Sequence, residues 1–106
     1  MNLQEIKSKY PKGYRKLFDW IIQNSITVWE DRYFEERCLY DFFDKQGIIL
    51  DIKFAFTVEE IWEYAVKEPN GDLITFQVGY ITRTEAEESG FMKCFAILEE
   101  RENDDN

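Results

Sequence analysis

The stretch that decides the fold is EIWEYAVKEPNGDLITFQVGY, residues 60–80. Large apolar residues recur at every second position on both sides of a central Pro69-Asn70-Gly71, which is the period of a half-buried strand. Proline suits the first corner of a type I turn, and glycine supplies the positive φ that must follow. The pattern predicts two antiparallel strands joined by a three-residue loop with a bulge. A capping box at residues 57–60 is the basis of a helical alternative, and the turn favours the hairpin over it.

The strand register is predicted from burial. A two-residue turn would set Trp62 against Gly79 and Tyr64 against Gln77, with the large apolar residues of the two strands on opposite faces. A three-residue loop sets Tyr64 against Phe76, and the neighbouring pairs are then Trp62 with Val78 and Val66 with Ile74. Because a slip of one residue turns every side chain to the other face, we expect the second register, with these residues on one face beneath the helices.

The flanking segments predict a third strand and a long helix. Residues 48–56, IILDIKFAF, alternate in polarity and predict the strand that completes a three-stranded meander. Thr84-Glu85-Ala86-Glu87 forms a capping box, and apolar residues follow it at helical spacing. These residues are Phe91, Cys94, Phe95 and Leu98. We expect this helix to end near Arg101 and to pack on the sheet.

Three helices are predicted before the sheet. Residues 3–9 form a short helical turn that stops before Pro11, and a longer helix runs from about Lys12 to Ser25. A third helix starts with Asp31 as its N-cap, continues to Lys45 and is closed by Gly47. Residues 26–29, ITVW, fit a short strand and a buried connection equally well, so their structure stays open.

This order of elements predicts an α+β domain with N-terminal helices, a three-stranded antiparallel meander and a C-terminal helix packed on one sheet face. The 106 residues suffice for a single domain, which we place at residues 1–101. Residues 102–106, ENDDN, are expected to form a disordered acidic tail.

Charge argues against several classes of partner. The chain has 13 Lys and Arg against 22 Asp and Glu, and its net charge of −9 repels nucleic-acid backbones and anionic membranes. Residues 1–25 differ, because their five basic residues outnumber Glu5 and Asp19. No signal-peptide pattern and no membrane-spanning apolar run is found, so we expect a cytoplasmic protein.

Side chains that commonly carry catalysis are scarce. Without histidine there is no imidazole base and no His metal ligand, and Cys38 and Cys94 fall on apolar helix stripes, as buried free thiols do. We expect no catalytic residue, no cofactor and no metal site. Carboxylates remain, and their common roles are to stabilise helix N-termini through the helix dipole and to keep a protein in solution. The candidate partner-binding residues are Glu59, Glu60, Glu63, Glu85, Glu87 and Glu88. The aromatic residues of the sheet are expected to form the core rather than a base-stacking surface.

Several stretches resemble small proteins encoded by phages and prophages of gut bacteria. They are YPKG at residues 10–13, LYDFFDKQGI at 39–48, TRTEAEE at 82–88 and FMKCFAILEE at 91–100. The resemblance implies a β-meander followed by a capped amphipathic helix. It implies no catalytic residue.

The sequence therefore favours a non-enzymatic protein-interaction protein of phage or mobile-element origin, with a protein partner that it does not identify. Two alternatives stay open: an acidic mimic of nucleic acid that inhibits a host enzyme, and an enzyme that uses carboxylates with a bound metal. A homodimer is also plausible, because the sheet has two edges and Leu73, Ile81 and Ile49 would leave apolar spots on its second face.

Overall fold

The computed structural model describes residues 3–24, 36–56 and 60–104 of the chain. Four helices and three strands follow one another in the predicted order, which confirms the α+β fold. The helices are α1 (Leu3–Lys9), α2 (Pro11–Gln23), α3 (Glu36–Lys45) and α4 (Arg83–Asp104). The strands are β1 (Ile49–Phe56), β2 (Glu60–Lys67) and β3 (Leu73–Tyr80), and they form one antiparallel sheet in the order β1-β2-β3.

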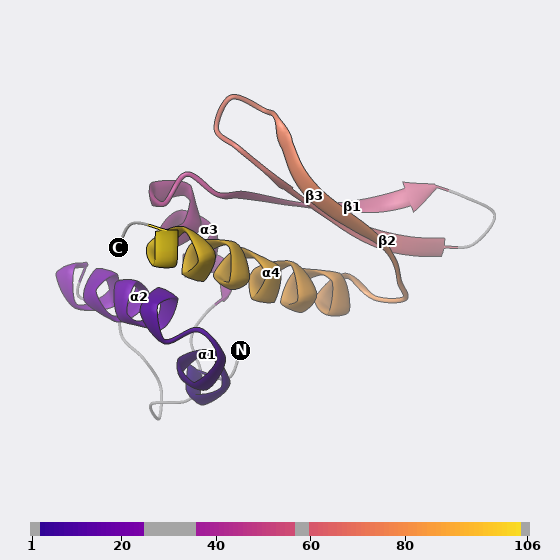
Figure 1. Cartoon of the computed structure of the whole chain (residues 1–106). Coiled ribbons are helices and arrows are strands. Elements are labelled where there is room, and N and C mark those ends of the chain that lie inside the picture. The colour runs from indigo at the N-terminus through magenta and orange to yellow at the C-terminus, as the bar shows by residue number, and fades with distance from the viewer. Residues whose placement is uncertain (1–2, 25–35, 57–59, 105–106) are drawn as a thin grey trace.

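Helix α4 forms the middle layer of the domain, with the sheet on one side and α1 and α2 on the other (Figure 1). Its apolar residues therefore face in two directions, toward the sheet and toward the other helices. Gly90 lies against Leu50 and Tyr64 of the sheet. One turn away, the Phe95 ring lies 4.8 Å from Phe43 of α3 and 6.4 Å from Tyr10, which precedes α2. A single helix thus joins both halves of the core.

The aromatic cluster at the centre comes from α3 and α4. Phe42, Phe43, Phe91 and Phe95 are fully buried. The Phe43 ring lies 5.0 Å from Phe42 and 6.2 Å from Phe91, and Tyr40 meets Phe91 edge-on at 4.9 Å. Each such ring pair adds about 0.5–1.5 kcal/mol beyond the burial of its area. Leu39, Phe42 and Phe43 of the predicted third helix are thus part of the core, and Cys38 lies half-buried beside it.

Strands β1 and β2 pair as the alternating pattern predicts. Leu50 lies opposite Val66, Ile52 opposite Tyr64, and Phe54 opposite Trp62. These three pairs share the face that α4 covers, where Leu50, Tyr64 and Val66 are buried.

The loop between β2 and β3 is the predicted three-residue loop. The Gly71 N–H donates to the Glu68 carbonyl at 2.8 Å, and the Glu68 N–H donates to the Asp72 carbonyl at 2.8 Å. Gly71 has a φ of 94°, which a glycine adopts without a Cβ clash. Lys67 lies opposite Leu73, as this loop requires.

The predicted register beyond that pair is wrong. A bulge between Lys67 and Val66 shifts the pairing by one residue, so Val66 faces Thr75 and Tyr64 faces Gln77 instead of Ile74 and Phe76. A second irregularity follows, and Trp62 faces Tyr80 instead of Val78. Our prediction assumed that helices cover the whole sheet. Helix α4 packs chiefly on β2 and β1 and less on β3, so burial does not select the apolar register at this edge.

Gly79 explains how the strand returns to the core after the shift. Its φ is 102°, the backbone of a bulge residue that only glycine adopts easily. The bulge turns the next side chain inward, and the Tyr80 ring lies 5.9 Å from Tyr64 on the helix face. Glycine inside a strand pattern is typical of such a bulge.

Two helix boundaries also differ from the prediction. Helix α4 continues to Asp104, so Glu102, Asn103 and Asp104 are helical and do not belong to a disordered tail. The N-terminal cap lies two residues earlier than predicted: the Thr82 hydroxyl accepts a hydrogen bond from the Glu85 N–H at 3.2 Å. Helix α2 ends at Gln23, near the predicted Ser25, and Gly47 closes α3 with a φ of 75°. The predictions for residues 26–29 and Asp31 lie outside the described residues, as do residues 57–59 of the capping box at 57–60, whose last residue begins β2.

Gly90→Ala is expected to destabilise the domain. A Cβ at this position would lie 2.7 Å from Leu50 Cδ1 and 3.3 Å from Tyr64 Cβ. Overpacking of a core costs about 1–3 kcal/mol, and the gain in helix propensity of about 1 kcal/mol offsets it only in part. Chemical denaturation measures the difference. The matched control is Gly13→Ala in α2, whose Cβ would meet its nearest atom, Phe95 Cδ1, at an ordinary 3.5 Å. Equal effects of the two substitutions would show that α4 does not approach the sheet this closely.

Candidate functional site

Large apolar side chains that solvent reaches gather on one strand. Among the described residues, seven large apolar residues are exposed, and two of them, Phe18 and Ile22, belong to α2. The other five lie on β3 or directly after it. We call them the β3 strip: Leu73, Ile74, Phe76, Val78 and Ile81. Phe76 is 58% exposed and Ile81 77%.

The shifted register puts the centre of the β3 strip on the outer face of the sheet. Phe76 lies opposite Ala65 and Val78 opposite Glu63 of β2. Ala65 and Glu63 alternate with the buried Tyr64, so they face away from α4. The aromatic side chain that we expected in the core thus stands in solvent.

The two edges of the sheet differ in charge. Strand β1 has Asp51 and Lys53 on its outer face, and the Asp51 carboxylate lies 3.4 Å from Lys53 Nζ and 3.3 Å from Lys67 Nζ. Charged side chains are a common guard against edge-to-edge association. Strand β3 contains no charged residue and no proline. Its edge therefore lacks protection by charge or proline, and only the two bulges interrupt it.

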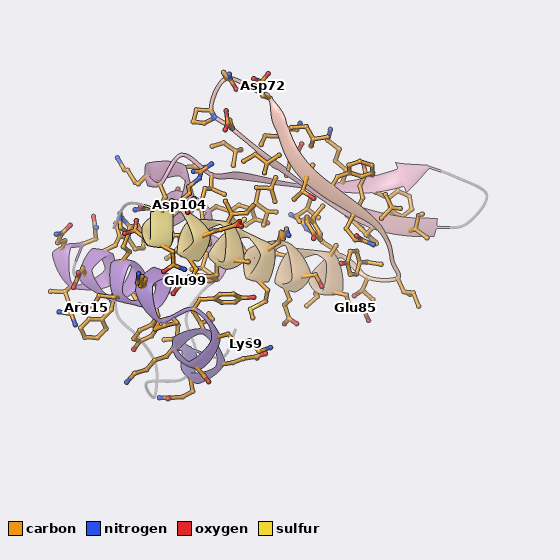
Figure 2. All side chains as sticks on the ribbon, in the orientation of Figure 1. Lys9, Arg15, Asp72, Glu85, Glu99 and Asp104 are labelled. Carbon is orange, nitrogen blue, oxygen red and sulfur yellow. The ribbon has the colours of Figure 1, made fainter. Side chains whose placement is uncertain are left out.

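The predicted carboxylates do not converge on one site. Glu63 lies on the outer face of the sheet. Glu85, Glu87 and Glu88 lie in the first turns of α4, which packs on the opposite face, and Figure 2 shows Glu85 there. Glu87 accepts a hydrogen bond from the Tyr40 hydroxyl at 2.6 Å and so joins α4 to α3. Glu59 and the side chain of Glu60 lie outside the described part of the chain. Their role in partner binding stays a prediction.

Glu99, near the end of α4, has a structural role that its place in the sequence did not reveal. Tyr10, the N-cap of α2, makes no side-chain cap. The Glu99 carboxylate takes this place from α4, because it accepts hydrogen bonds from the backbone N–H groups of Lys12 at 3.1 Å and Gly13 at 2.7 Å. A negative charge at a helix N-terminus also matches the helix dipole. Beside it, Lys16 Nζ lies 2.8 Å from Glu102, so two contacts dock α2 on α4.

Glu99→Ala is expected to lower the free energy of unfolding by about 1–2 kcal/mol, because two N–H groups of α2 lose their acceptor. Urea denaturation measures the loss. The control is Glu100→Ala, a neighbouring exposed carboxylate that should change stability by less than about 0.5 kcal/mol. Similar values for the two variants would contradict the capping role.

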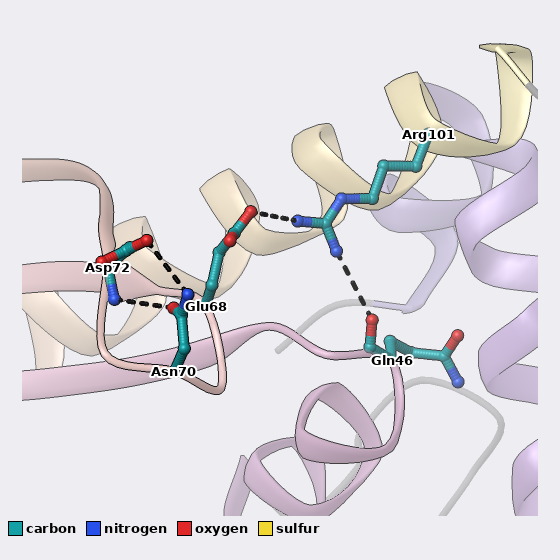
Figure 3. A network of polar contacts seen from close by, with 5 residues as sticks. All are labelled: Gln46, Glu68, Asn70, Asp72 and Arg101. Carbon is teal, nitrogen blue, oxygen red and sulfur yellow. Dashed lines mark hydrogen bonds and ion pairs between the residues drawn. The ribbon is translucent and has the colours of Figure 1, made fainter.

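Polar contacts link the turn end of the β2–β3 hairpin to α4 and to the residue that follows α3 (Figure 3). The Arg101 guanidinium donates to the Gln46 carbonyl at 3.5 Å and lies 4.0 Å from the Glu68 carboxylate. Within the loop, Asn70 and Asp72 exchange two hydrogen bonds of 3.0 Å. The β3 strip therefore starts from an anchored turn.

Helices α1 and α2, which contain the five basic residues of the N-terminal segment, lie on the far side of α4 from the sheet (Figure 1). Between α1 and α2, a surface hollow of about 380 Å³ is lined by Lys7, Pro11, Tyr14, Arg15 and Phe18. Lys7 Nζ lies 5.8 Å from the Tyr14 ring centre, and Arg15 lies 3.6 Å from Asp19 in an exposed ion pair. The five basic side chains of this segment are all exposed.

The two cysteines lie in different surroundings. Cys94 is fully buried between α4 and the sheet, and burial raises the pKa of its thiol to about 12. Cys38 of α3 is half-buried. Since the thiolate is the reactive form, burial and the raised pKa both lower the reactivity of Cys94 at neutral pH.

Stability is expected to fall at alkaline pH through Cys94. The thiol keeps its proton in the folded state up to about pH 12, while the unfolded chain loses it from about pH 9. The contribution of the protonated Cys94 thiol to the free energy of unfolding is therefore fully present below pH 9, and it is lost as the pH rises toward 12. Denaturation curves of the wild type and Cys94→Ala, compared at pH 8 and pH 11, should differ less at the higher pH. A constant difference would contradict the raised pKa.

The described residues contain no group of three Cys, Asp or Glu that could hold a metal ion. None of the described helices is both long and apolar enough to cross a membrane. In comparisons with known proteins, the chain matches no family model, no curated protein and no solved structure.

Proposed function

We propose that this chain is a small non-enzymatic protein-interaction module that binds its partner through the β3 strip. The observation that carries the proposal is the gathering of five exposed apolar side chains on β3 and directly after it, in a stretch without charge. Contiguous apolar surface of this kind is typical of protein contacts. Burying it on a partner removes that surface from water at about 25 cal/mol per Å².

The arrangement of carboxylates supports this proposal over a mimic of nucleic acid. A mimic needs a row of free acidic groups on one face. Glu87, Glu99 and Glu102 are instead engaged with other elements of the fold, and Glu63 faces away from the acidic start of α4. An origin in a phage or another mobile element goes with the proposal and is based on the sequence resemblance alone.

Substitution in the β3 strip is expected to abolish partner capture. The immobilised full chain, incubated with a bacterial lysate, should retain at least tenfold more of its partner than the variant Phe76→Glu/Val78→Glu, because carboxylates in the contact would be desolvated. The control is Glu85→Gln/Glu88→Gln, which changes the same number of charged groups on α4.

Ionic strength separates the two mechanisms. Capture through apolar surface should persist in 1 M salt, whereas a mimic of nucleic acid must release its partner when its charges are screened. Release in salt together with loss of binding in the Glu85→Gln/Glu88→Gln variant would contradict the proposal.

A further inference from the structure

We infer that the β3 edge binds the β3 edge of a second copy of this chain, antiparallel, so that the two sheets continue as one. The inference builds on the proposed function, because it names a partner for the same strip. Three features of the described residues support it: the direction of the backbone groups, the symmetry of the strand sequence, and the distribution of charge and apolar area.

The backbone of β3 has hydrogen-bonding groups that point to its free edge. The Glu68 N–H donates to the Asp72 carbonyl, so the polar groups of Glu68 face β3. Backbone N–H and C=O groups alternate in direction along a strand, and hence those of Val66 and Tyr64 also point to β3. Their partners, Thr75 and Gln77, direct their own groups to β2. The N–H and C=O groups of Phe76 and Val78 therefore point outward, where a further strand can pair with them.

The sequence of β3 is complementary to itself about Phe76. In an antiparallel pair around a two-fold axis at this residue, Phe76 lies opposite Phe76 of the second copy. On either side, Ile74 lies opposite Val78 and Thr75 opposite Gln77. Apolar residues thus meet apolar residues and polar meet polar, and such cross-strand pairs each contribute to the stability of a sheet. Because α4 packs chiefly over β1 and β2, the helices of the two copies stay apart.

Charge limits where two copies can meet. Each copy has a net charge of −9, so a contact that brings carboxylates together is repelled. The ten residues from Leu73 to Thr82 contain no charge. Their five apolar side chains expose on the order of 500 Å² per copy, at the upper end for a monomer. Edge pairing covers the flanks of the side chains on β3, and their outer surface stays on the face of the extended sheet.

Analytical ultracentrifugation of the purified full chain, from micromolar to millimolar concentration, tests the inference. We expect a monomer–dimer equilibrium that tightens as salt screens the repulsion between two acidic copies. Phe76→Glu should raise the dissociation constant at least tenfold. The matched control is Phe18→Glu, which makes the same change at an exposed phenylalanine of α2 and should leave the equilibrium unchanged. Circular dichroism confirms that both variants fold.

A cysteine cross-link tests the pairing itself. Paired residues at a two-fold axis have Cα atoms about 5.5 Å apart, within the range of a disulfide. In a Cys38→Ser background, Phe76→Cys should form a covalent dimer on oxidation, and Lys53→Cys on the outer face of β1 should not. The antiparallel register would be overturned if Phe76→Glu disrupts the dimer but Phe76→Cys does not cross-link it.

The remaining outcomes separate this inference from the proposed function. A monomer at every concentration overturns the inference, and the proposed function stands if Phe76→Glu/Val78→Glu still abolishes capture of a protein from lysate. If Phe18→Glu disrupts the dimer and Phe76→Glu leaves it intact, the contact lies on α2 and the inference is overturned. If Phe76 matters neither for self-association nor for capture, both fail.

Discussion

The structure depends on a helix that is apolar on two sides. Helix α4 lies against the sheet through Gly90 and Cys94 and against the other helices through Phe91 and Phe95. The absence of a side chain at Gly90 allows the helix to lie close to Leu50 and Tyr64. Without this close contact, the aromatic cluster of α3 and α4 and the inner face of the sheet would be two separate and smaller cores, each with less apolar area to bury.

One helix cannot cover three strands equally, and this shapes the outer surface. Strands β1 and β2 lie under α4, and their inner faces contain the large apolar residues. Strand β3 extends past the helix, and its inward positions are occupied by Thr75 and Gln77. Two bulges make this possible, since they turn Phe76 and Val78 outward and then return Tyr80 to the core. Exposed apolar surface at β3 is therefore built into the pairing of the strands.

Local chemistry made the fold predictable, and non-local packing limited the prediction. The hairpin loop at residues 68–72, the closing Gly47 and the apolar stripe of α4 are each determined by neighbours within a few residues, and each was confirmed. The prediction of the β3 register was wrong because the register depends on where α4 lies over the sheet. Gly79 was the available signal, since a glycine inside an alternating strand is typical of a bulge. The capping of α2 by Glu99 joins residues 86 positions apart in the sequence, and no spacing pattern reports it.

The position of α4 in the sequence sets the order in which the domain can be completed during synthesis. The ribosome makes the helix of the middle layer after every other described element. A nascent chain that has reached Thr82 already contains Phe43, Leu50 and Val66, but nothing yet separates the sheet from the N-terminal helices. Native packing must wait until α4 has left the exit tunnel, and during that interval the emerging chain presents apolar surface to chaperones.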